Sequence, residues 1–256
     1  MTITMPDAGA ASAARRTPAK KETMYDDAGF YLAMIVVSAV LIFAGFAPSF
    51  YLKSVINAPP PLTLLTITHG VVYTGWMIVV IAQASFIAMK KPAPHRQIGV
   101  LGALLFGAVV AVGISTALTA ARLGHAPPGA PLQPGFSALP IIGILTVLGV
   151  VAAALLLRRR PDWHKRLMLA GFIMMTQPGT GRLAIPFGIP EFGIGFSFIV
   201  MELLLAAAIF YDWRKYGRVH PAYWTAAGVY AVYNAVIYWV FASPAWAAFV
   251  NSLIGN

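Results

Sequence analysis

One uncharged stretch of the chain carries polar and aromatic side chains at helical spacing. No residue between Lys53 and Lys90 is formally charged, which leaves ample room for the roughly 20 apolar residues that cross a bilayer. Within this stretch, five residues recur at intervals of three, four, three and seven: Thr66, His69, Tyr73, Trp76 and Gln83. Because unpaired polar groups are costly in hydrocarbon, this side of a membrane helix is expected to face other helices.

Other polar side chains fall in apolar segments. Glu202 is the only acidic residue well inside such a segment, Arg182 lies at the edge of one, and Asn234 lies near the middle of another. Counting about 1.5 Å per residue along each helix places Arg182 near one membrane surface, His69 about seven residues below it, Glu202 somewhat deeper and Asn234 near the middle. One interpretation is a ligand cavity formed by His69, Tyr73, Trp76, Gln177, Arg182, Glu202, Asn234 and Tyr238. The other is a structural ion pair between Glu202 and Arg182, with His69 as a hydrogen-bonded core residue.

Three further histidines lie at the opposite ends of the apolar segments, each near Arg or Lys. Neutral imidazole ligates metals and haem iron, so the candidate ligands of haem b or a metal are His69, His95, His164 and His220. His69 cannot share a haem with His95 or His164, because it lies near the other membrane surface. The alternative is that the His-Arg and His-Lys pairs bind lipid phosphate and cap the helix starts.

Composition places the chain among polytopic membrane proteins. Hydrophobic residues make up 59% of the chain, charged residues only 10%, and the mean hydropathy is +0.76, values that exclude an ordinary soluble domain. The net charge of +10 comes from short loops between apolar segments and indicates membrane orientation rather than nucleic-acid binding. Expected partners are the lipid bilayer and either other membrane subunits or further copies of the chain. With no cysteine, disulfides, thiolate metal sites and c-type haem are excluded.

The apolar pattern predicts an all-α bundle of seven transmembrane helices over residues 29–256, after a disordered cytoplasmic tail over residues 1–28. The predicted spans are about 29–51, 61–89, 97–121, 137–157, 166–182, 193–211 and 223–242. In the third span, small residues recur every four positions and predict a packing ridge: Ala103, Gly107, Ala111, Ser115 and Thr119. In the fifth, Pro178, Gly179 and Gly181 predict a break in the helix.

A basic hairpin recurs between the spans. The pattern Lys-Lys-Pro-x-x-His-Arg at 90–96 matches Arg-Arg-Pro-x-x-His-Lys at 159–165, and residues 214–220 form a looser third copy. The fold is therefore predicted to be three helical hairpins plus one leading helix. Fifteen of the eighteen Lys and Arg residues lie on the side of the N-terminus, so the positive-inside rule predicts that the N-terminus is inside and the C-terminus outside. A bacterial inner membrane fits this pattern.

The Pro-x-x-His-Arg and Pro-x-x-His-Lys hairpins resemble those of uncharacterised bacterial seven-helix membrane proteins. More distantly, they are similar to membrane cytochromes of the b561 type, which carry His-Arg at a helix start. The second resemblance implies a haem- or quinone-associated protein, or an accessory subunit of an electron-transfer complex. The residues themselves leave two alternatives open. These are a small-molecule carrier or sensor with a periplasm-facing polar cavity, and a structural subunit of a membrane complex.

Overall fold

The computed structural model describes residues 23–56 and 61–255. Most of the predicted tail 1–28 lies outside the described residues. Within them the chain is all-helical, with no strand. By length and composition, five helices are apolar enough to cross a membrane: α1 with its π-helical extension, α3, α4, α5 and α8. A sixth span results if α9 and α10 are counted together. The chain thus has the helices of a membrane protein.

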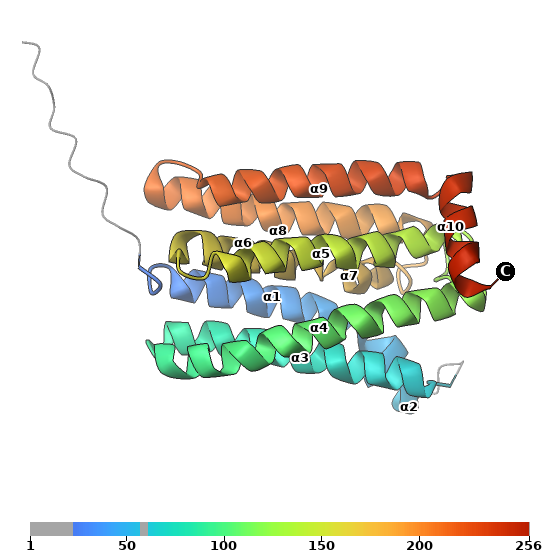
Figure 1. Cartoon of the computed structure of the whole chain (residues 1–256), viewed down its shortest axis with the longest axis horizontal. Coiled ribbons are helices and arrows are strands. Elements are labelled where there is room, and N and C mark those ends of the chain that lie inside the picture. The colour runs from blue at the N-terminus through green and yellow to red at the C-terminus, as the bar shows by residue number, and fades with distance from the viewer. Residues whose placement is uncertain (1–22, 57–60, 256) are drawn as a thin grey trace, which may run out of the picture.

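The long helices run along one axis in three layers, as Figure 1 shows. At one side lie α3 (Leu64–Ala88) and α4 (Pro92–Arg122), and at the other α8 (Gly193–Tyr216) and α9 (Pro221–Val240). Between them lie α1 (Ala28–Phe46), α5 (Ala138–Leu156), α6 (Pro161–Met174) and α7 (Gln177–Leu183).

Short connections at 89–91, 157–160 and 217–220 lie at one end of the bundle, beside the start of α1 (Figure 1). We call this the hairpin end. Proline opens each returning helix at Pro92, Pro161 and Pro221, where its missing N–H costs nothing.

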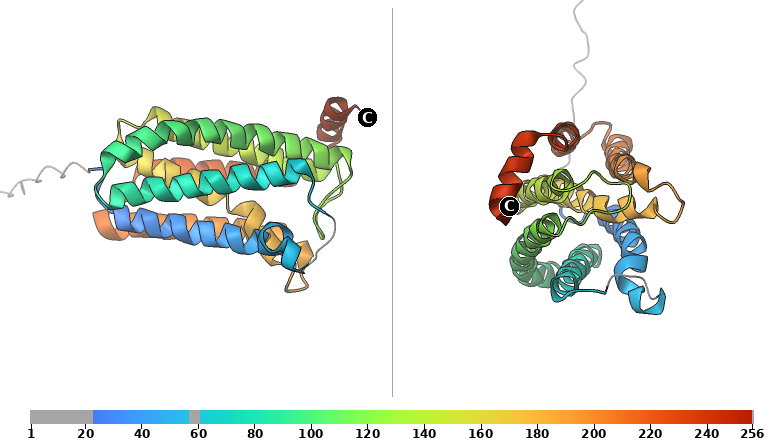
Figure 2. Two further views of the ribbon diagram at one scale, coloured as in Figure 1. Left: turned by 90° about the horizontal axis from the view of Figure 1, so that it is seen from below. Right: turned by 90° about the vertical axis from the view of Figure 1, so that its right-hand side faces the viewer.

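The opposite end, which we call the cavity end, holds the shorter elements. They are the π-helix Ala47–Tyr51, α2 (Lys53–Ile56), the 3₁₀ turns Gly135–Ser137 and Pro190–Phe192, and α10 (Pro244–Ile254). After α9 the chain bends by 83°, and α10 lies across this end of the bundle (Figure 2). The Trp246 Nε1–H donates to Ser137 Oγ at 3.1 Å, which ties α10 to the start of α5. The last predicted span had ended at about residue 242, before this helix.

The fifth predicted span is interrupted, in agreement with its Pro and Gly residues. Helix α6 ends at Met174 and α7 begins at Gln177. Neither piece has the length of a membrane span, so this predicted crossing is not among the five or six spans that the described helices provide. After the break, α7 lies very close to α1. A Cβ at Gly45 would overlap the Gly179 backbone. Glycine at both positions is therefore needed for this contact.

The predicted packing ridge on α4 does not face the other helices of the chain. All five of its small residues are exposed, and a Cβ at Gly107 would meet nothing. The face that packs inward is instead Phe106, Val109, Gly113, Ala117 and Ala121. Since α4 has small residues on two faces, spacing alone could not tell which face meets the other helices.

Candidate functional site

A cavity of about 430 Å³ lies toward the cavity end, between α1, α3, α4, α5 and α7. Of the eight residues predicted to form a ligand cavity, five line it: His69, Tyr73, Trp76, Gln177 and Arg182. Most of the remaining lining is Pro, Phe, Met, Leu, Ile, Ala and Gly. The combination of an apolar wall with a few polar groups is typical of small-molecule sites, whose volumes run from about 300 to 1,000 Å³.

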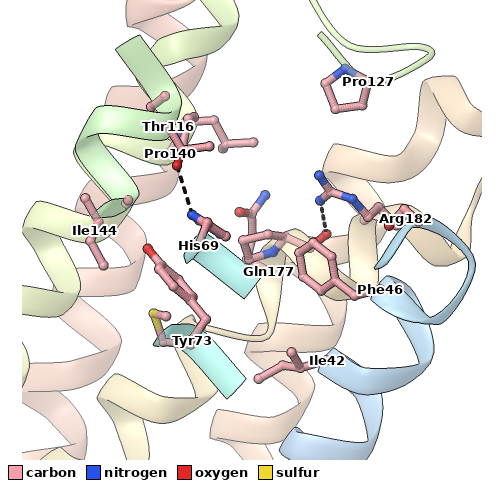
Figure 3. Close-up of a pocket in the computed structure, with 18 of the residues that line it drawn as sticks. Ile42, Phe46, His69, Tyr73, Thr116, Pro127, Pro140, Ile144, Gln177 and Arg182 are labelled. Atoms are coloured by element: carbon pink, nitrogen blue, oxygen red, sulfur yellow. Dashed lines mark hydrogen bonds between the residues drawn. The ribbon is translucent and has the colours of Figure 1, made fainter. Parts of the chain in front are cut away.

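His69 and Tyr73 form one wall of the cavity, from α3 (Figure 3). Their rings stack with centroids 4.0 Å apart and planes 17° apart. His69 Nδ1 lies 3.2 Å from Thr116 Oγ1, and the Thr116 hydroxyl donates to the Val112 carbonyl at 2.8 Å. Because that hydroxyl proton is already used, His69 Nδ1–H is the donor to Thr116, and its Nε2 is left for another partner.

The Tyr73 phenol fits because α4 carries glycine opposite it. A Cβ at Gly113 would collide with Tyr73 Oη. Among the described residues Tyr73 Oη makes no hydrogen bond, and it lines the cavity. Deeper in the bundle, the Trp76 ring lies 5.0 Å from Phe106 and 5.7 Å from Phe172 between centroids. Trp76 and Phe172 line the cavity and give it an aromatic floor.

Helix α7 brings the other polar groups to the cavity, because the break before Gln177 turns the chain there (Figure 3). Gln177 is buried and its Nε2 donates to Ser197 Oγ at 3.1 Å. Arg182 is half-buried, donates from Nη1 to the Pro178 carbonyl at 2.7 Å, and has its guanidinium carbon 4.4 Å from the Phe46 ring centroid. Within the described part of the chain, no carboxylate forms an ion pair with Arg182.

The structure does not bring Glu202, Asn234 and Tyr238 to this cavity. Asn234 Nδ2 donates to Glu202 Oε1 at 2.5 Å, on the exposed face of α8 and α9, and Tyr238 is 58% exposed. The predicted approach of Glu202 to Arg182 and His69 is therefore wrong, as is the alternative of a Glu202–Arg182 ion pair. Depth alone does not decide which side chains meet, because rotation about each helix axis sets the direction of the side chain.

The candidate haem or metal ligands separate into distinct places. His95 and His164 come together at the hairpin end, with ring centroids 6.4 Å apart. Each Nδ1 pairs with a carbonyl of the preceding helix. His95 Nδ1 lies 3.2 Å from the Gln83 carbonyl, and His164 Nδ1 lies 2.8 Å from the Ala154 carbonyl. His69 lies in the cavity, far from both. No group of three or more metal-ligating side chains occurs among the described residues.

His220 belongs to a different environment, because it precedes its proline and caps α9. Its Nδ1 accepts from the Ala222 N–H at 3.1 Å, and its Nε2 lies 3.1 Å from Asp162 Oδ2, which describes a neutral imidazole donating from Nε2. Burial, then the charge of Arg166, lower the pKa of His220 despite the opposing effect of Asp162. His220 thus serves as a structural cap.

A buried ion pair that the sequence did not reveal holds the hairpin end together. Arg166 on α6 and Asp212 on α8 have side chains 1% and 3% exposed. Nη2 and Nε of Arg166 donate to Asp212 Oδ1 at 2.5 and 3.1 Å. The other carboxylate oxygen accepts from the His220 N–H at 2.7 Å. Three helices therefore meet at a single carboxylate.

Asp27, just before α1, is a second acceptor at the hairpin end. Its side chain is 2% exposed, accepts hydrogen bonds from the phenols of Tyr211 and Tyr216, and lies 3.9 Å from Lys165 Nζ and 3.5 Å from Lys215 Nζ. Burial raises the pKa of Asp27, but the two phenols and the two lysines outweigh it and leave the pKa below its ordinary value. This carboxylate connects the start of α1 to α6 and α8.

Comparison with protein-family models, with curated proteins and with solved structures found no match for this chain. The geometry of the site is therefore the basis for any functional conclusion.

Proposed function

We propose that this membrane protein binds a small, mainly apolar molecule in the cavity between α1, α3, α4, α5 and α7, as a carrier or a sensor. The observation that carries the proposal is the cavity itself. It has a volume of about 430 Å³, its walls are mainly apolar, and His69, Gln177 and Arg182 contribute polar groups to its lining. A protein interior is normally packed without voids much larger than a water molecule. A partly open cavity of this size, reached by polar groups, therefore supports a binding site.

The unused hydrogen-bonding capacity of the lining supports this proposal over a purely structural role. His69 Nε2 and Tyr73 Oη have no hydrogen-bond partner within the described residues, although both side chains face the cavity. A structural polar group in a membrane interior is normally satisfied by its neighbours. The ligand would supply the missing partners.

Filling the cavity tests the proposal. Ala117 on α4 lines the cavity, and Ala117→Phe is expected to occlude it. Ala103→Phe adds the same side chain to the exposed face of the same helix and is the matched control. We expect small molecules extracted from the purified wild type and from A103F, and identified by mass spectrometry, to be lost from A117F. Equal recovery from all three proteins would contradict the proposal.

A second candidate function rests on His95 and His164. Their rings are close, each Nδ1–H is oriented by a backbone carbonyl, and each Nε2 makes no hydrogen bond within the described residues, which is how haem- or metal-ligating histidines are commonly held. If they ligate haem, protein from haem-replete cells should show a Soret band that shifts on reduction. H95A and H164A should change it, whereas H220A should not. Protein that stays colourless after incubation with haem would exclude this function.

The proposed setting is a bacterial cytoplasmic membrane crossed seven times, with α6 and α7 together as the fifth crossing and the hairpin end in the cytoplasm. The bias of Lys and Arg toward the hairpin end supports it. Because the chain lacks cysteine, single cysteines report exposure cleanly. Ser54→Cys and Leu132→Cys at the cavity end should react with an impermeant thiol reagent on intact cells. Ala93→Cys at the hairpin end should react only after lysis, and the reverse pattern would overturn the orientation.

A further inference from the structure

Resting on the proposed function, we infer that the ligand is an amphipathic carboxylate with a single apolar chain, whose head group binds Arg182. Among the described residues that line the cavity, Arg182 is the one with a formal charge, and none is Asp or Glu. The cavity therefore carries a net positive charge inside a largely apolar wall. Such a site favours an anion over a neutral or cationic molecule of the same shape.

The contacts of Arg182 leave it able to receive an anion. One guanidinium nitrogen donates to the Pro178 carbonyl, and the group lies over the Phe46 ring. These contacts orient the group but do not neutralise its charge. A guanidinium has five N–H donors in a planar fork, so donors remain for a carboxylate, which it binds in a bidentate manner.

The same cavity separates a polar end from an apolar one. His69 and Arg182 lie toward the cavity end, whereas Trp76 is two helical turns deeper, about 10 Å along α3 at 1.5 Å per residue. There the walls are Trp76, Phe172 and Val147. A head group at Arg182 and a chain directed at Trp76 would satisfy both regions. The cavity volume, near the lower end of the range for small-molecule sites, suits one chain better than a diacyl phospholipid.

The head-group preference can be measured with three ten-carbon probes that differ in charge. Radiolabelled decanoate is bound to the full-length protein in phosphatidylcholine nanodiscs, and unlabelled decanoate, decanol and decylamine compete for it. For the wild type we expect decanoate to compete at least about tenfold better than decanol, and decylamine to compete least. Empty nanodiscs correct for partition into the bilayer.

Variants assign the preference to Arg182. R182Q should bind decanoate no better than decanol while still binding decanol, and R182K should keep part of the preference. The matched control is R122Q, because Arg122 is exposed at the end of α4 and does not line the cavity. A wild type that binds decanol and decanoate equally, or an R182Q variant that retains the preference, would overturn the carboxylate assignment but leave the proposed function standing. A wild type that binds none of the probes would overturn both.

One arm separates a free carboxylate from a lipid head group. The assay is repeated in nanodiscs that contain phosphatidylglycerol. Unchanged decanoate binding is expected if the cavity admits a single chain. If the wild type loses decanoate binding in these nanodiscs but still binds radiolabelled decanol, Arg182 is assigned to phospholipid head groups and the inference is overturned.

Discussion

The two ends of the bundle use the same residue types in opposite ways. At the hairpin end, Arg166 is enclosed with Asp212, and the pair is almost completely buried. At the cavity end, Arg182 borders about 430 Å³ of space and forms no ion pair within the described residues. A tyrosine in the middle of the bundle differs from one at the cavity in the same way. The buried Tyr230 phenol donates to the Ala170 carbonyl at 2.6 Å, whereas the Tyr73 phenol faces the cavity.

The difference shows how a structural polar group can be told from a binding group. In a low-dielectric interior each charge needs a partner. Where the partner belongs to the chain, the group fixes the packing of helices. Where the chain supplies none and leaves space beside the group, the partner is expected from outside. The following predictions test this distinction, from the largest expected effect to the smallest.

The buried ion pair should give the largest effect. Asp212→Leu leaves Arg166 charged and enclosed and removes the acceptor of the His220 N–H, so we expect a loss of about 3–5 kcal/mol in the free energy of unfolding. Unfolding in mild detergent, followed by circular dichroism, measures it. Adding Arg166→Met to Asp212→Leu should recover part of that loss. A double variant no more stable than D212L would show that the unpaired charge is not the main cost.

The two tyrosines give a matched comparison. Tyr230→Phe removes a buried hydrogen bond and should cost about 1 kcal/mol. Tyr73→Phe removes a hydroxyl that has no partner within the described residues, so its stability without ligand should match that of wild type. The same unfolding assay measures both. Equal losses would show that Tyr73 is also a structural group.

Lowering the pH should weaken the hairpin end. The pKa of His220 is lower in the folded chain than its ordinary value near 6.5, so the unfolded chain takes up the proton first and stability falls as the pH drops below about 6.5. His220→Asn keeps a capping acceptor and should flatten this part of the profile. Asp27 affects stability in a lower pH range than His220. Because the pKa of Asp27 is lowered, its contribution to stability is lost as the pH falls below the ordinary value for Asp, about 3.9. An unchanged profile for H220N between pH 5 and 6.5 would contradict the assignment.

The smallest effect on stability is expected for Arg182→Gln without ligand. The variant loses a contact with the Phe46 ring and a hydrogen bond to a backbone carbonyl, but strands no buried carboxylate, so the change should stay within about 1 kcal/mol. Unfolding of R182Q beside D212L measures the contrast directly. A loss as large as that of D212L would place Arg182 among the structural groups.

Much of the architecture could be predicted from the sequence because apolar length and periodicity depend on nearby residues. The uncharged stretch between Lys53 and Lys90 predicted α3, and Pro178 with its neighbouring glycines predicted the interruption between α6 and α7. The helical spacing of His69, Tyr73 and Trp76 placed them on one side of α3, and all three line the cavity.

The mistakes concern the direction in which helices face. Glu202 was expected to approach Arg182 but lies on a different face of the bundle, and the small residues from Ala103 to Thr119 face outward. The buried pair was missed because Arg166 stands in a run of basic residues and Asp212 stands beside Trp213 and Arg214. The local sequence of such a run does not show which charged residue is buried and which of its neighbours are exposed.

By itself, the sequence determined that this chain is an all-helical membrane protein with a basic hairpin end and a broken helix, because transfer to lipid depends on composition along a segment. Only the tertiary structure decided which polar groups pair with one another. It gave Arg166 a carboxylate and left Arg182 beside a cavity, because pairing depends on the rotation and packing of helices distant in the chain.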